Sequence, residues 1–147
     1  MTIRVLVADD QAMIRGALAG LLDLESDIEV VAQASDGANA LDELARLASA
    51  DAPARASAPV DVAIIDIEMP RMDGITATQA ICSRFPGVRV LIVSTFGRPG
   101  YLQRALDAGA TGFMVKDAPV ETLAEGVRTV AAGGRAIDQS LALEALS

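Results

Sequence analysis

The chain has 147 residues, the length of one ordinary domain, and 52% of them are hydrophobic, which excludes a disordered tail. Its 12 basic and 20 acidic residues give a formal net charge of -8, so we expect no direct contact with nucleic acid. The absence of histidine and the single cysteine, Cys82, exclude histidine chemistry, an internal disulfide and a cysteine-rich zinc site. No apolar run reaches the roughly 18 residues of a membrane span, and the first residues lack the apolar core of a signal peptide, so we expect a soluble cytoplasmic domain.

Short runs rich in valine and isoleucine alternate along the chain with stretches whose apolar residues recur at helical spacing. The runs are almost continuously apolar, which is typical of strands that are buried on both faces of a sheet. In chain order, strand first, the predicted elements are Ile3–Ala8, Met13–Leu22, Ile28–Ala34, Ala38–Ala48, Val60–Ile65, Ile75–Phe85, Val88–Val93, Tyr101–Ala108, Gly112–Val115 and Val120–Ala132.

Residues at the ends of these elements support the assignment. Asp36-Gly37 and Asp73-Gly74 precede the second and third helices, Gly109 follows the fourth, and Pro119 lies where proline is tolerated at a helix start. Strict alternation of strands and helices predicts a parallel sheet with right-handed crossovers and helices on both faces.

Two segments interrupt the alternation. Ser49–Pro59 is rich in alanine, proline and serine without any period, so we interpret it as a long surface loop that the fold tolerates. The segment from Gly133 to Ser147 is too short for a second domain and is interpreted as a linker or a helix stub.

Chemically active side chains fall at the carboxyl ends of the predicted strands, where parallel sheets bind their ligands. Asp9 and Asp10 follow the first strand, Asp66 the third, Ser94 the fourth and Lys116 the fifth. If the first and third strands are neighbours, three carboxylates meet in one pocket, opposite a hydroxyl group and the only lysine of the chain. Such a cluster favours a hard divalent cation, Mg²⁺ in particular.

Each of these residues also has a simpler interpretation when taken singly. Asp10 could be only the N-cap of the first helix, Ser94 only a cap, and Lys116 only a solvated side chain. Cys82 is most simply a small core residue. Their coincidence at one edge of the sheet, in chain order, favours a functional site.

These residues resemble the receiver domain of two-component response regulators over residues 3 to about 134. The most specific motif is Asp66-Ile67-Glu68-Met69-Pro70-Arg71-Met72-Asp73-Gly74, which is very similar to the family's phospho-acceptor segment. Asp9-Asp10, Val93-Ser94 and Gly112–Lys116 match its acidic pair, its switch residue and its lysine strand. The lysine and tail segments resemble the NarL/FixJ subgroup, and Thr95–Tyr101 resembles DesR-type members.

The resemblance implies a flavodoxin-like doubly wound fold with a five-stranded parallel sheet in the order 2-1-3-4-5. It implies that Asp66 is phosphorylated, that Asp10 and Asp66 bind Mg²⁺ directly, and that Asp9 acts partly through water. Glu68 would offer its backbone carbonyl to the metal. Lys116 would contact a phosphoryl oxygen, and Ser94 would hydrogen-bond another, with Phe113 as an aromatic switch residue.

The resemblance also predicts partners and a domain division. A sensor histidine kinase would be the phosphoryl donor, and phosphorylation would promote a homodimer. Residues 1–134 would form the receiver domain, and residues 135–147 would lead to a DNA-binding output domain that controls transcription. A dimer surface could come from apolar stripes that could equally be core, namely Met13, Ile14, Leu18, Leu21, Leu22, Val127 and Val130.

Two features depart from the family pattern. Asp117 follows Lys116 where many receivers have proline, so we expect no cis peptide bond there. The loop before the third strand is longer than usual. Glu68 and Phe96 occupy the two positions that influence dephosphorylation in the family.

Three other functions are open to this sequence. An aspartyl phosphatase on a similar sheet would usually carry a second aspartate where this chain has Glu68. A nucleotide- or flavin-binding domain would carry a glycine-rich phosphate motif, and neither common form occurs. A pseudo-receiver that serves only as an interaction module would lack part of the acid, serine and lysine set. We therefore predict a phospho-accepting signalling domain rather than an enzyme with its own substrate.

Overall fold

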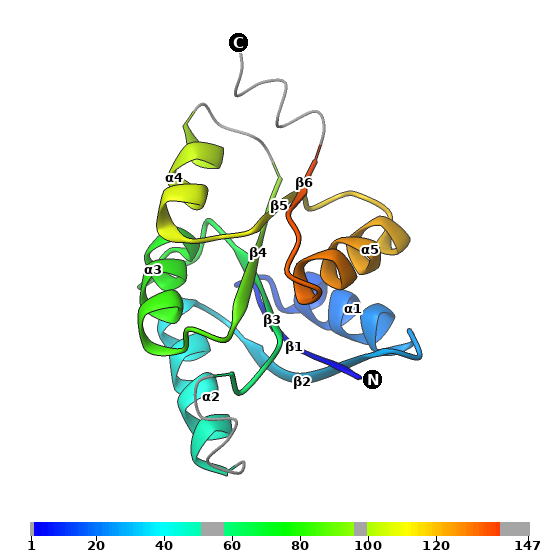
Figure 1. Ribbon diagram of the computed structural model, residues 1–147, viewed down its shortest axis with the longest axis horizontal. Coiled ribbons are helices and arrows are strands. Elements are labelled where there is room, and N and C mark those ends of the chain that lie inside the picture. The colour runs from blue at the N-terminus through cyan, green and yellow to red at the C-terminus, as the bar shows by residue number, and fades with distance from the viewer. Residues whose placement is uncertain (1, 51–57, 96–99, 139–147) are drawn as a thin grey trace.

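The computed structural model describes residues 2–50, 58–95 and 100–138 of the chain (Figure 1). Its elements, in chain order, are β1 (Ile3–Ala8), α1 (Ala12–Asp23), β2 (Ile28–Ala34), α2 (Gly37–Ala50), β3 (Val62–Asp66), α3 (Gly74–Arg84), β4 (Arg89–Ser94), α4 (Tyr101–Ala108), β5 (Gly112–Val115), α5 (Val120–Ala131) and β6 (Ala136–Ile137). The first ten agree closely with the elements predicted from the sequence. Helix α2 includes the first two residues of the predicted surface loop, and residues 51–57 of that loop lie outside the described ranges.

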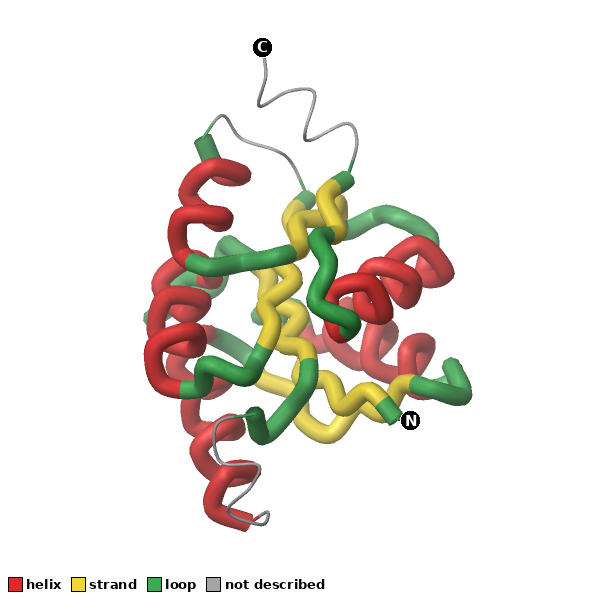
Figure 2. Tube along the Cα trace, in the orientation of Figure 1, coloured by secondary structure: helices red, strands yellow, loops and turns green. Residues whose placement is uncertain are grey.

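The strands form one parallel sheet in the order β2-β1-β3-β4-β5-β6. Helices α2, α3 and α4 cover one face of the sheet, and α1 and α5 cover the other (Figures 1 and 2). The sequence prediction of an α/β fold with a doubly wound parallel sheet is confirmed. This topology places the carboxyl ends of β1 and β3 side by side, with β4 next to β3.

Strand residues alternate between two separate cores, as the two-residue period of a strand requires. On β3, Ala63 and Ile65 pack in the core beneath α2, α3 and α4, whereas Val62 and Ile64 pack in the core beneath α1 and α5. All four side chains are fully buried. Burial on both faces explains why the strands read as continuous apolar runs.

The sheet has six strands, so the prediction of five was wrong by one. Strand β6 pairs in parallel with β5. The N–H groups of Ala136 and Asp138 donate to the carbonyl oxygens of Thr111 and Phe113 at 3.0 and 2.9 Å. Gly133, at φ 93, lies in the turn after α5 that returns the chain to the sheet. The added strand pairs an edge of β5 whose backbone groups would otherwise be open to other chains.

The helix ends follow the signals in the sequence. A carboxylate oxygen of Asp73 accepts a hydrogen bond from the N–H of Thr76 at 2.8 Å and caps α3. Asp36 accepts from the N–H of Asn39 at 2.8 Å and caps α2. Gly109, at φ 111, ends α4 in the left-handed conformation.

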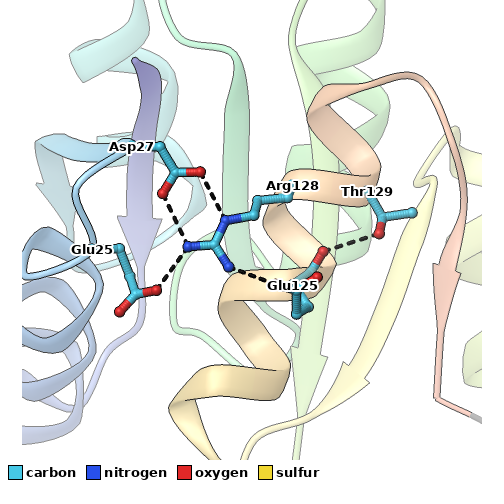
Figure 3. A network of polar contacts seen from close by, with 5 residues as sticks. All are labelled: Glu25, Asp27, Glu125, Arg128 and Thr129. Atoms are coloured by element: carbon cyan, nitrogen blue, oxygen red, sulfur yellow. Dashed lines mark hydrogen bonds and ion pairs between the residues drawn. The ribbon is translucent and has the colours of Figure 1, made fainter. Parts of the chain in front are cut away.

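Arg128 fixes α5 against the turn between α1 and β2 (Figure 3). Its Nε and Nη2 atoms lie 2.8 and 2.7 Å from carboxylate oxygens of Asp27 and Glu25, and its Nη1 atom lies 2.7 Å from Glu125. One guanidinium group therefore joins three carboxylates from two separate segments. This contact sets how α5 lies beside α1.

The apolar stripes of α1 and α5 are only partly core. Leu22, Val127 and Val130 are fully buried, as the core interpretation required. Four other large apolar side chains are exposed, three on α1 and one at its C-cap, and we call them the α1 apolar face: Met13, Ile14, Leu21 and Leu24. Among the described residues, no helix is both long and apolar enough to cross a bilayer.

Candidate metal and phosphoryl site

The predicted site residues lie at one edge of the sheet. Asp9 and Asp10 directly follow β1, Asp66 is the last residue of β3, Ser94 is the last residue of β4, and Lys116 directly follows β5. Parallel strands present all their carboxyl ends at the same edge. The buried strands that precede these residues therefore hold them on one rigid frame.

Asp9, Asp10 and Asp66 form a carboxylate cluster. Each offers an oxygen atom, and the three atoms lie within 4.8 Å of one another. Asp9 and Asp66 are buried at 1% and 6% exposure, whereas Asp10 is exposed. The prediction that these three acids converge is confirmed.

Lys116 supplies positive charge to the cluster. Its Nζ atom lies 2.6 Å from Oδ2 of Asp9 and 3.3 Å from Oδ2 of Asp66. Burial alone would lower the pKa of Lys116, but the contacts with the two carboxylates outweigh burial and raise it above its ordinary value. The lysine therefore stays charged and bridges β1 and β3.

Burial raises the pKa of Asp66 to about 6. The ammonium group of Lys116 opposes this rise, and the negative charge of Asp9 adds to it. The one ammonium group therefore faces two buried carboxylates, with the third, Asp10, close beside them. A divalent cation would remove this excess of negative charge.

The backbone around Asp9 is fixed by two contacts with α1. The N–H of Gln11 donates to Oδ1 of Asp9 at 2.8 Å, and Nη1 of Arg15 donates to the carbonyl oxygen of Asp9, also at 2.8 Å. Asp9, rather than Asp10, therefore holds the start of α1, and Asp10 is left at the mouth of the cluster. The anchoring role of Arg15 was missed, although its place in the first turn of the helix was the signal for it.

Ser94 is buried at 6% exposure at the end of β4. Its carbonyl oxygen accepts a hydrogen bond from the N–H of Lys116 at 2.8 Å, which ties the ends of β4 and β5 together. The register pairs Asp66 with Val93, the residue before Ser94. Thr95 is exposed, and residues 96–99, including Phe96, lie outside the described ranges.

Glu68 lies in the loop after β3, two residues beyond Asp66. Its side chain is exposed, and its carboxylate is not part of the cluster found among the described residues. Its predicted contribution through the backbone carbonyl stays a prediction. Phe113 is fully buried in the core beneath α2, α3 and α4.

The residues present fit a hard divalent cation. Oδ2 of Asp9 is buried, and its partner among the described residues is the ammonium group of Lys116, so a carboxylate oxygen with two lone pairs can still bind a cation. The other donors of the cluster are also carboxylate oxygens, which are the ligands that Mg²⁺ prefers. Soft ligands are absent from the cluster, which disfavours zinc or copper.

This geometry agrees with a comparison against protein families. The model of the response regulator receiver domain matches residues 5–128 of the chain. The chain belongs to this family. The resemblance inferred from the sequence motifs is therefore confirmed, and the site described above is the acidic edge of a receiver domain.

Similar proteins agree with this assignment. The receiver domain is 40% identical to the transcriptional regulatory protein DesR of Bacillus subtilis over 133 residues, which are 90% of this chain and 60% of that protein. It is 38% identical to the uncharacterized transcriptional regulatory protein YvfU of the same organism over 139 residues, which are 95% of this chain and 64% of that protein. The chain thus spans less than two thirds of the length of these curated relatives.

A solved structure has the same fold. The signal receiver domain of the putative response regulator NarL from Mycobacterium tuberculosis is 34% identical to this chain, with a TM-score of 0.78. The match covers 90% of this chain and 98% of that structure. The fold is therefore flavodoxin-like, with β6 added at one edge of the sheet.

Proposed function

We propose that this receiver domain is the phosphorylation switch of a response regulator that controls transcription. The observation that carries the proposal is the meeting of Asp9, Asp10, Asp66 and Lys116 at one edge of the sheet. A carboxylate nucleophile surrounded by groups that offset phosphoryl charge is suited to forming an aspartyl phosphate. The domain then acts by changing state rather than by turning over a substrate of its own.

The proposed reaction is a transfer from a phosphohistidine of a sensor histidine kinase. An oxygen of Asp66 attacks the phosphorus atom, the phosphorus–nitrogen bond breaks, and the histidine ring leaves with the electron pair. The product is an acyl phosphate on Asp66. The absence of histidine in this chain agrees with a donor on another protein.

The other groups of the site have proposed roles in binding the metal and the phosphoryl group. Asp9, Asp10 and Asp66, with the backbone carbonyl of Glu68, would hold Mg²⁺, which when bound offsets the negative charge of the phosphoryl oxygens. Lys116 would contact one phosphoryl oxygen through its ammonium group. Ser94 would donate its hydroxyl to another.

The switch would begin where Ser94 meets the β4–α4 loop. Phosphorylation adds a charge of about −1.5 to −2 at the sheet edge. A hydrogen bond from Ser94 would draw the start of that loop toward Asp66, because Asp66 and Val93 are paired in adjacent strands. Phe113, which is buried on the adjacent strand β5, would stabilise the loop in this inward position.

The α1 apolar face supports a homodimer as the response. Met13 is 88% exposed and Leu24 is 80% exposed, and such side chains are costly to leave in water. We propose that residues 135–147 lead to a DNA-binding output domain, and the names of YvfU and DesR as transcriptional regulatory proteins support this proposal. The cytoplasm, where kinase and DNA are both available, is the proposed location.

The test is phosphoryl uptake from acetyl phosphate in Mg²⁺ by the Asp66→Asn variant. We expect uptake to be abolished with the fold intact, because the substitution keeps the shape of the side chain and removes the nucleophile. Asp107→Asn, on the exposed side of α4, is the matched control and should be labelled like the wild type. Labelling of Asp66→Asn would overturn the proposal, and steady release of phosphate from a phosphomonoester would favour a phosphatase instead.

A further inference from the structure

The segment between Asp66 and α3, residues 67–73, is held at its base. We call it the acceptor loop. The N–H of Gly74 donates to the carbonyl oxygen of Ile67 at 2.8 Å, and Asp73 caps α3 through the N–H of Thr76. These contacts fix the two ends of the loop. Neither contact involves the corner of the loop, at Pro70, Arg71 and Met72.

The corner of the acceptor loop has an unusual backbone conformation. Arg71 has φ 64, and it is the only residue other than glycine with a positive φ among the described residues. The N–H of Met72 donates to the carbonyl oxygen of Pro70 at 2.6 Å, which closes a three-residue γ-turn around Arg71. A positive φ in such a turn is strained for an L side chain, so other contacts must stabilise it.

Asp36, in the turn between β2 and α2, supplies those contacts. Its carboxylate is buried at 1% exposure, and Oδ1 accepts from the N–H of Asn39. Oδ2 accepts from both Nε and Nη2 of Arg71, with the Nε bond at 2.7 Å. Both oxygens of a buried carboxylate are thus used, one to start α2 and one to hold the loop corner.

A backbone contact supports the same junction. The N–H of Gly37 donates to the carbonyl oxygen of Met72 at 3.1 Å. A Cβ at Gly37 would lie 2.7 Å from that oxygen, so the two backbones approach as closely as glycine permits. The acceptor loop is therefore docked on the β2–α2 turn by one backbone bond and one ion pair.

We infer that Arg71 and Asp36 form a clamp that positions the acceptor loop for metal binding at Asp66. Arg71 is a positioning residue, because its guanidinium group contacts Asp36 and no group of the carboxylate cluster. Pro70 and Met69 are all that separate Arg71 from Glu68, whose backbone carbonyl is a proposed Mg²⁺ ligand. This inference rests on the proposed function, since it needs Mg²⁺ to bind beside Asp66.

Exposure of Arg71 bears on how much the clamp contributes. The side chain of Arg71 is 71% exposed whereas Asp36 is 1% exposed, so water screens the ion pair from the arginine side and limits what it adds to the stability of the fold. The ion pair acts mainly on the position of the loop. Without it, the loop corner would leave the positive φ of Arg71, which an L side chain does not favour. The clamp should therefore affect metal affinity more than folding.

Calorimetric titration of Mg²⁺ into four proteins tests the clamp: wild type, Arg71→Ala, Arg71→Gly and the control Arg46→Ala. Arg46 lies on α2 and pairs with Glu43 on the surface, so its loss removes the ion pair of another exposed arginine away from the loop. We expect Arg71→Ala to weaken Mg²⁺ binding about fivefold and Arg46→Ala to leave it unchanged.

Arg71→Gly separates positioning from backbone strain. Glycine adopts a positive φ freely, so this variant should resist urea better than Arg71→Ala but bind Mg²⁺ no more tightly. Asp36→Asn combined with Arg71→Ala should weaken binding no further than Arg71→Ala does alone. Wild-type Mg²⁺ affinity in Arg71→Ala, or its recovery in Arg71→Gly, would overturn the clamp. A wild-type protein that binds no Mg²⁺ would instead overturn the proposed function.

Discussion

Lys116 carries one positive charge in a pocket that holds three carboxylates. Without a metal, its ammonium group is the nearest counter-charge for the buried carboxylates of Asp9 and Asp66. With a metal, the cation and the ammonium group would share the same oxygens. Lys116 should therefore stabilise the fold when no metal is bound. It should also weaken metal binding slightly, because the ammonium group already neutralises the oxygens that the cation would bind.

Replacing Lys116 by methionine tests this balance. The variant keeps most of the apolar stem but leaves two buried carboxylates without a counter-charge, so we expect it to lose about 3 kcal/mol of unfolding free energy without Mg²⁺. Saturating Mg²⁺ should stabilise the variant more than the wild type, because the cation replaces the missing charge. Urea titrations with and without Mg²⁺ measure both effects.

The exposed control for that measurement is Arg46→Met, which removes a cation on the surface of α2. It should change the unfolding free energy by less than about 1 kcal/mol, with or without Mg²⁺. An equal loss for Lys116→Met in both conditions would contradict the shared-charge account.

The site residues were predictable because the sequence places each one just after a recognisable strand. Asp9, Asp66, Ser94 and Lys116 needed only that rule and the order of strands. The Asp36–Arg71 contact was not predictable, because nothing in the sequence marks Arg71 as having a positive φ. Its partner lies 35 residues earlier, in a turn that looked only like a helix start.

At the level of elements, the start of α3 is packed directly on the end of β3. A Cβ at Gly74 would lie 2.2 Å from the carbonyl oxygen of Asp66 and 2.9 Å from Cα of Ile67. Both are backbone atoms, which cannot move aside without shifting Asp66 itself. Gly20, inside α1, is the opposite case, since nothing lies within 4 Å of the position its Cβ would take.

These two glycines predict opposite effects of the same substitution. Gly74→Ala should destabilise the fold by at least about 2 kcal/mol, because alanine would force α3 away from the sheet. Gly20→Ala should stabilise it by up to about 1 kcal/mol, because alanine favours a helix and meets no neighbour. Thermal unfolding of both variants checks the signs, and a stabilised Gly74→Ala would contradict the described packing.

The ten long elements could be predicted because hydrophobic pattern and end signals agree for each. Strand β6 could not, since Ala136 and Ile137 are too few residues to show a period. Its formation depends on the open edge of β5, which is a tertiary feature. The same limit explains why the sequence predicts only a linker or a helix stub for the segment that starts at Gly133.

For the molecule as a whole, two features bear on association: the negative net charge and the α1 apolar face. The net charge of -8 opposes association of two copies, and the α1 apolar face favours it. We propose that a phosphoryl group at the carboxyl edge of the sheet, where α1 begins, shifts this balance between monomer and dimer.

Sedimentation with beryllofluoride and Mg²⁺, a phosphoryl analogue, tests this balance. We expect the wild type to form dimers and Met13→Glu to remain monomeric, because a charge on the α1 apolar face would be buried in the contact. Gln79→Glu adds the same charge to α3, on the other face of the sheet, and should dimerise like the wild type. A Met13→Glu protein that dimerises equally would exclude this face as the interface.

The sequence could not distinguish a core stripe from an interface on α1. Met13 and Leu22 belong to the same apolar pattern, yet one is 88% exposed and the other fully buried. The spacing of apolar residues shows which face of a helix is apolar, but it does not show how much of that face its neighbours cover. Leu22 packs in the core with Val7 and Ile28 of the neighbouring strands, and this tertiary contact decides that it is buried while Met13 is not.

The most direct test of the account is to locate the phosphoryl group by tandem mass spectrometry after treatment with acetyl phosphate. With Mg²⁺ present, we expect one phosphoryl group per chain, attached to Asp66. With the metal removed by a chelator, we expect almost none. A phosphoryl group on any other residue, or equal labelling of Asp66 without a divalent cation, would contradict it.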